Sequence, residues 1–182
     1  SPAISRTVRS IRIAAPPFFV LYHTFFYFGT QYSQKEEMYM NEDTLHLLSE
    51  CAAGTDMAIR SLEDVLKNSA EGPLQKRLLD SKRQHEQLAA QAEDRLRGQG
   101  KEPKRADPAA RAMSYLKTQA MLSMKPGDAT TADLISTGCS MGIKSLARYC
   151  NQYPTADEDA RGLAQSLIRL EDQLVKDMRP YL

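Results

Sequence analysis

Apolar residues recur at helical spacing over most of the chain, starting near residue 41. In the first segment, residues 41–68, they alternate between three and four positions apart, which is a heptad pattern. The pattern consists of Leu45, Leu48, Ala52, Thr55, Ile59, Leu62 and Leu66. Asn41 can cap this helix, and Glu42 and Asp43 suit its positive N-terminal end. The segment is therefore predicted to be a long helix that packs at a shallow angle in a bundle.

Four further helices are predicted, separated by turn signals that contain glycine, proline or capping residues. They cover about 73–97, 108–124, 128–152 and 155–178, and Thr155 with Glu158 has the spacing of a capping box. The connections at 69–72 and 153–154 are short, so each joins two antiparallel helices. The inward residues expected for the second helix are Leu74, Leu78, Leu88, Ala92 and Leu96, and those for the last are Leu163, Leu167, Leu170, Leu174 and Met178.

A nine-residue stretch occurs twice, at 54–62 and again 84 positions later at 138–146. Both copies read Gly-x-x-Met-[Ala/Gly]-Ile-[Arg/Lys]-Ser-Leu, and each precedes a turn and a second long helix. The body is thus predicted to be two helical hairpins joined by a crossover that contains a short fifth helix. Glycine inside a helix costs roughly 1 kcal/mol. We therefore expect Gly54 and Gly138 to allow a close approach between helices.

Residues 1–39 differ in character from the rest. They contain all five Phe and four of the eight Tyr, and basic residues precede an apolar run at 13–28. That order suits a secretion signal, but two adjacent prolines interrupt the run, which is shorter than the roughly 20 residues of a membrane span. A structural arm is a third alternative. Residues 34–37 can be encoded by a purine-rich ribosome-binding sequence, which favours a translated upstream leader at 1–39 and one body at 40–182.

The charge of the chain is nearly balanced, with 24 Lys and Arg against 23 Asp and Glu. A nucleic-acid partner is not expected, because such proteins carry a basic excess or stripe. No membrane contact is expected unless 1–39 is a genuine anchor. Three cysteines cannot pair fully and form no CxxC motif, which favours a reducing, cytoplasmic location. Cys51, Cys139 and Cys150 are expected to be small core residues.

The two Gly-x-x-Met stretches, together with residues 160–169, resemble small bacterial ferritin-like proteins of unknown function, in the neighbourhood of the spore-coat F-type proteins. The resemblance covers residues 40–182 and none of 1–39. It implies an all-α, ferritin-like four-helix bundle made of two antiparallel helical hairpins. It also leaves a spore association open as an alternative to a purely cytoplasmic role.

The di-iron site of such bundles needs a Glu on each of two helices and a Glu-x-x-His motif on each of the other two. His85 lies in the second predicted helix, but Lys82 stands three positions before it, and the last helix has no His. A complete di-iron site is therefore not expected. The weaker alternative is one metal ion, with iron as the cofactor, near His85 with Glu86 or Glu50.

No phosphate-binding loop or nucleophile elbow occurs in the sequence, so an enzyme is not expected. Methionine is frequent in the body, and its flexible side chain suits adaptable contacts. We expect a structural or protein-interaction role, as a homo-oligomer or with another protein. The expected packing and interface residues are Gly54, Met57, Met113, Met121, Gly138 and Met141. The alternative is a metal- or redox-linked protein with a degenerate site near His85.

Overall fold

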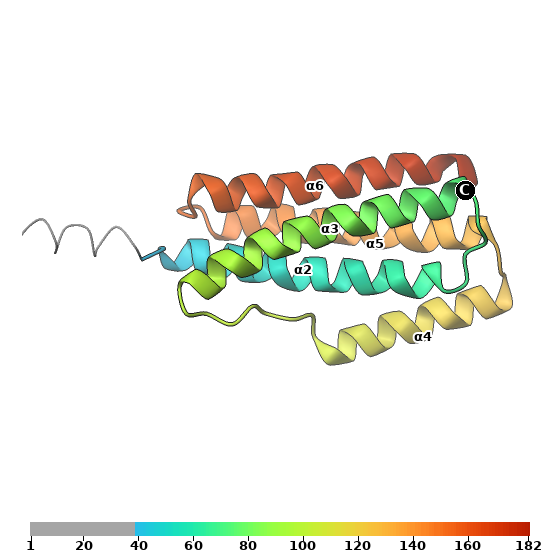
Figure 1. Ribbon diagram of the computed structural model, residues 1–182, viewed down its shortest axis with the longest axis horizontal. Helices are drawn as coiled ribbons and strands as arrows, with labels where there is room; N and C mark the ends of the chain where they lie inside the picture. Colours follow the sequence, from blue (N-terminus) through green and yellow to red (C-terminus); the bar gives the residue numbers. More distant parts are fainter. Residues whose placement is uncertain (1–38) are drawn as a thin grey trace, which may run out of the picture. The chain divides into compact units, whose positions relative to one another are not determined.

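The computed structural model describes residues 39–182, in which there are five α-helices and no strand (Figure 1). The elements are α2 (Glu42–Leu66), α3 (Pro73–Gly98), α4 (Pro108–Met124), α5 (Asp128–Gln152), α6 (Glu158–Met178) and a final 3-10 turn, η1 (Arg179–Tyr181). The predicted all-α class is confirmed, and the helix bounds agree with the predicted ones to within a few residues. The predictions for 1–38 lie outside the described residues.

The four long helices form two pairs of neighbours (Figure 1). Helix α2 packs chiefly on α3, and α5 packs chiefly on α6, while α3–α6 and α2–α5 contacts bring the pairs together. Short connections join the helices within each pair. Helix α4 belongs to the long connection between the pairs and packs on α2 and α5. Within residues 39–182, no helix is both long and apolar enough to cross a membrane.

The apolar core consists of two separate clusters, one toward each end of the long helices. The first is Leu47, Leu48, Cys51, Ala52, Ala92, Leu96, Leu146, Ala156, Ala160, Leu163, Ala164 and Leu167. The second is Leu62, Val65, Leu74, Leu78, Ala132, Ile135, Leu174 and Met178. Most residues expected to point inward are therefore buried, but Leu45, Ile59, Leu66, Leu88 and Leu170 are only partly so. Because each cluster draws on helices from both pairs, burial of apolar surface holds the pairs together.

Polar contacts between α2 and α6 reinforce the end of the molecule where both helices begin. Asp157 caps α6 by accepting a hydrogen bond from the Ala160 amide at 2.8 Å, and its own amide donates to Thr44 Oγ1 at 2.8 Å. The expected capping box at Thr155 is wrong. Instead, the Thr155 hydroxyl donates to Asp43 Oδ2 at 2.6 Å, because α6 begins two residues later than that motif requires. These bonds fix the starts of α2 and α6 against each other.

We expect Asp157→Ala to destabilise the protein by about 1–2 kcal/mol, the usual cost of losing an N-cap. The same change removes the 2.7 Å ion pair between Asp157 and Arg95 of α3. Urea unfolding followed by circular dichroism measures the effect. Asp159→Ala is the matched control, since Asp159 is exposed in the same first turn and is not the cap. Equal losses in the two variants would contradict the prediction.

Candidate functional site in a buried polar layer

A layer of buried polar side chains separates the two apolar clusters. It contains Thr55 of α2, Ser81 and His85 of α3, and Glu171 of α6, and we call these four residues the polar layer. On each helix they lie between residues of the first cluster and residues of the second. Thr55 satisfies its hydroxyl locally by donating to the Cys51 carbonyl at 2.9 Å. The other members are less completely paired, which makes the layer the chemically unusual part of the interior.

His85 is 1% exposed, and its ring orientation is set within its own helix. Nδ1 lies 2.9 Å from the Ser81 carbonyl oxygen, which can only accept, so Nδ1 carries the hydrogen and Nε2 is left with its lone pair. Nε2 has no hydrogen-bond partner among the described residues and lies 4.0 Å from Glu171 Oε1. Burial lowers the pKa of His85, so the ring is neutral at pH 7.

Glu171 is the second unusual group, since it is 6% exposed and the neutral His85 is the only basic side chain that the described residues place within 4 Å of its carboxyl oxygens. Burial raises the pKa of Glu171 to about 8, so the side chain is mostly a neutral carboxylic acid at pH 7. Its Oε2 atom has no hydrogen-bond partner in the described part of the chain. The layer therefore holds a neutral acid and a neutral base that face each other just beyond hydrogen-bond distance.

Gly142 of α5 provides the space for the Glu171 carboxyl group. A Cβ atom at position 142 would lie 2.7 Å from Glu171 Cδ and 2.6 Å from Oε1, so the Glu171 carboxyl group would have to move to make room for a side chain there. The expected close approach at Gly54 and Gly138 is wrong, because both are exposed and an added Cβ would meet nothing within 4 Å. The close approach lies one helical turn after Gly138 and involves a carboxyl group, not a neighbouring helix backbone.

Two of the cysteines, Cys51 and Cys139, are not activated by this environment. Burial, with a smaller effect from Glu171, raises the pKa of Cys139 to about 12, and burial likewise raises the pKa of Cys51 to about 12. A thiol with such a pKa remains protonated at neutral pH and is a poor nucleophile and metal ligand. Cys51 is part of the first cluster, as expected, whereas Cys139 and Cys150 are only partly buried.

The structure does not bring together the three predicted metal ligands. His85 is buried, but Glu86 is exposed and accepts from Lys82 Nζ at 2.7 Å, and Glu50 accepts from Lys104 Nζ at 2.6 Å. Within residues 39–182, no group of three or more His, Cys, Asp or Glu side chains is placed to hold a metal ion. The partner of His85 is instead Glu171. Glu171 follows Leu167 by four residues and precedes Leu174 by three. This spacing was the signal in the sequence that Glu171 lies on the inward face of the last helix.

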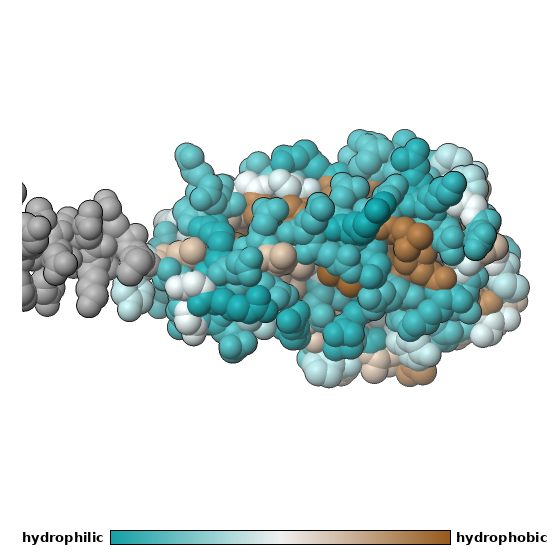
Figure 2. Space-filling view, viewed as in Figure 1, coloured by the Kyte–Doolittle hydropathy of each residue, from teal (hydrophilic) through white to brown (hydrophobic). Residues whose placement is uncertain are grey.

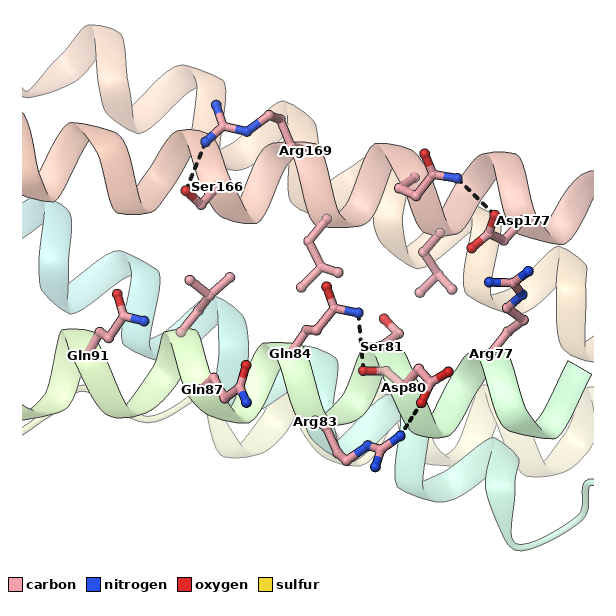
Figure 3. A pocket seen from close by; sticks show the side chains of 14 residues that line it. Arg77, Asp80, Ser81, Arg83, Gln84, Gln87, Gln91, Ser166, Arg169 and Asp177 are labelled. Carbon is pink, nitrogen blue, oxygen red and sulfur yellow. Dashed lines mark hydrogen bonds and ion pairs between the residues drawn. The ribbon is translucent and has the colours of Figure 1, made fainter.

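The polar layer reaches the surface at a groove between α3 and α6. The groove has a volume of about 740 Å³ and is lined by Arg77, Asp80, Ser81, Arg83, Gln84, Gln87, Leu88, Gln91, Ser166, Arg169, Leu170, Gln173, Leu174 and Asp177 (Figure 3). Ser81 belongs both to this lining and to the polar layer, and its Oγ lies 3.4 Å from His85 Nδ1. The side chain of Ser81 therefore lies between the solvent in the groove and the buried imidazole of His85.

Comparison with known proteins adds no assignment, because no family model, curated protein or solved structure matches the chain. The relation to ferritin-like proteins rests on the sequence stretches described above and stays a prediction.

Proposed function

We propose that the protein has no catalytic role and acts by binding protein chains, in the first place a second copy of itself. A ferritin-like arrangement of the two hairpins is part of this proposal. The observation that carries it is the outward orientation of apolar residues on α4. Met113, Leu116 and Met124 are 68%, 60% and 87% exposed, while only Thr118 and Leu122 of this helix are buried. We call these three exposed residues the α4 surface.

A further exposed apolar residue lies on α5. On α5, which α4 contacts, Met141 is 67% exposed and lines a shallow depression. Figure 2 shows hydrophobic side chains at the outer edge of the molecule where α4 lies in Figure 1. Of the interface residues expected from the sequence, Met57 and Met121 are partly exposed and the others are exposed. Exposed apolar residues that gather on one helix, as those of the α4 surface do, mark interaction sites.

Charge at the two ends of α4 favours a second copy as the partner. Asp107 stands at the N-terminal end and Lys125 at the C-terminal end, both exposed, with the apolar residues between them. In an antiparallel two-fold contact, Asp107 of each copy lies opposite Lys125 of the other. The helix itself carries Arg111 and Lys117 but no carboxylate, so an acidic partner protein is the alternative occupant.

We expect the full-length protein to be a dimer that Met113→Glu with Leu116→Glu converts to a monomer. Two charges placed in a buried apolar contact should weaken association by at least about 100-fold. Size-exclusion chromatography with light scattering over a range of concentrations measures this. Leu79→Glu is the matched control, since Leu79 is an exposed leucine on α3, which does not pack on α4. A wild-type protein that remains monomeric at high concentration would refute the proposal.

The metal- or redox-linked alternative has weaker support. An imidazole nitrogen and a carboxylate oxygen face each other at 4.0 Å, and both are ligand types for first-row transition metals. Two side chains do not make a metal centre, and the described residues supply no third ligand. A metal count after adding iron to the purified protein separates the alternatives. One bound iron per chain that is lost on His85→Leu would favour the metal-linked role. A cytoplasmic location remains part of the main proposal.

A further inference from the structure

The groove between α3 and α6 has apolar residues at its floor and polar residues along its sides. Leu88 of α3 and Leu170 of α6 are partly exposed in it, and Leu174 lies deeper. Figure 2 shows hydrophobic side chains between these two helices, and Figure 3 shows the polar side chains that rise beside them. Gln87 and Gln91 have no hydrogen-bond partner among the described residues, so their amides are available to a ligand.

The groove lining carries three arginines and two aspartates, which is a net charge of +1. Asp80 pairs with Arg83, while Asp177 accepts from the neutral Gln173 Nε2 at 2.9 Å and keeps its negative charge. Arg169 donates to the Ser166 hydroxyl at 2.9 Å and has no carboxylate partner among the described residues. Arg77 forms no ion pair with any described residue.

The two arginines lie at defined places along the groove. In Figure 3, Arg77 stands opposite Asp177, and Arg169 precedes Asp177 by eight residues on α6. At 1.5 Å per residue, Arg77 and Arg169 are therefore about 12 Å apart along the helix axes. That distance is close to two turns of an α-helix. From Arg77 to Gln91 the lining of α3 extends for roughly 20 Å, which is long for a small metabolite.

We propose that this groove binds an amphipathic helix of another protein, with an apolar stripe and two carboxylates about two turns apart. The apolar stripe would cover Leu88 and Leu170, and the carboxylates would meet Arg77 and Arg169. A straight groove between two helices accepts a third helix in this way, with apolar anchors for affinity and charges for register. The site is on the opposite side of the helix pairs from the contacts of α4, so it does not depend on self-association.

The test uses the full-length protein and a fluorescein-labelled synthetic peptide of about 18 residues, long enough to cover the groove. The peptide is helical, with a leucine stripe flanked by two glutamates about seven positions apart. Fluorescence anisotropy should show saturable binding that weakens as salt is added. Arg77→Glu with Arg169→Glu should weaken binding by at least about tenfold. Arg77→Gln with Arg169→Gln should give a smaller loss and a shallower salt dependence.

Two controls make the result specific. Lys76→Glu with Lys101→Glu changes the net charge equally at exposed positions outside the groove, and should leave binding within about twofold of the wild type. A peptide with lysines in place of its glutamates should not bind. No binding of the acidic peptide, equal binding of both peptides, or equal loss in the control variant would overturn the proposal. The Met113→Glu and Leu116→Glu variant should bind the peptide normally, so this proposal and the proposed dimer can fail separately.

Discussion

Replacing Glu171 with glutamine is expected to remove most of the pH dependence of stability between pH 6.5 and 8. The folded protein holds a proton on Glu171 up to a pKa of about 8, whereas the unfolded chain releases it near 4.5. The folded state therefore binds more protons in this range, and its stability falls as the pH rises through it. The loss is about 1.4 kcal/mol per pH unit, or roughly 2 kcal/mol over the window.

The titration of His85 sets the lower limit of this pH range. Burial lowers the pKa of His85 from 6.5, so below that pH the unfolded chain gains a proton that the folded protein does not accept. Stability then falls with acidification, which opposes the effect of Glu171. The thiols of Cys51 and Cys139, whose pKa values burial raises to about 12, titrate well above pH 8. Between pH 6.5 and 8, Glu171 is thus the dominant titrating group of the polar layer.

Urea unfolding of the wild type and Glu171→Gln at several pH values measures the difference directly. Asp172→Asn is the matched control, since Asp172 is the next residue on α6 and is half exposed with Lys176 as its partner. It should retain the wild-type slope. If Glu171→Gln showed the same slope as the wild type, the carboxyl group would not be the buried acid described here.

The second large effect is expected at Gly142. Gly142→Ala should destabilise the protein by about 1–3 kcal/mol, because the new methyl group would occupy the place of the Glu171 carboxyl group. Alanine is otherwise preferred to glycine in a helix by up to about 1 kcal/mol. The steric cost must therefore exceed this gain for the net effect to be a loss. Thermal or urea unfolding gives the sign and the size.

A double-mutant cycle identifies the cause of that loss. In the Glu171→Ala background the carboxyl group is absent, so Gly142→Ala should become neutral or stabilising, with a coupling of about 2 kcal/mol or more between the two sites. Gly138→Ala provides the control within the same helix. Because an added Cβ meets nothing there, it should stabilise the protein by about 0.5–1 kcal/mol. A Gly142→Ala variant that is stabilised in the wild-type background would contradict the assigned contact.

Much of the fold could be predicted because helix formation depends on residues near one another in the chain. The heptad pattern of residues 41–68, the proline starts at 73 and 108, and the short connections gave five helices close to their observed bounds. Capping was less predictable. Thr155 and Asp157 both have side chains that can cap a helix. Hydrogen bonds with Thr44 and Asp43 of α2, which is distant in the sequence, hold Asp157 at the cap position and Thr155 outside the helix.

The candidate site could be predicted only in part. His85 stood out as a histidine in a predicted core helix, but the sequence paired it with Glu86 and Glu50, which turned out to bind lysines at the surface. In the last helix Leu170, and not Glu171, was expected to point inward, because Leu170 fits an apolar stripe equally well. The two positions differ by about 100° around the helix, and a rotation of that size exchanges which one is buried.

By itself, the sequence determined the class of the fold, the helices and most of the apolar core, since these follow from local periodicity. Only the tertiary structure decided which carboxyl group is buried and what faces it. Helix α6 turns Glu171 inward because α3 places the imidazole of His85 on one side and α5 leaves space above Gly142 on another. Those contacts join residues 29 to 86 positions apart in the chain, where sequence periodicity carries no information about rotation or register.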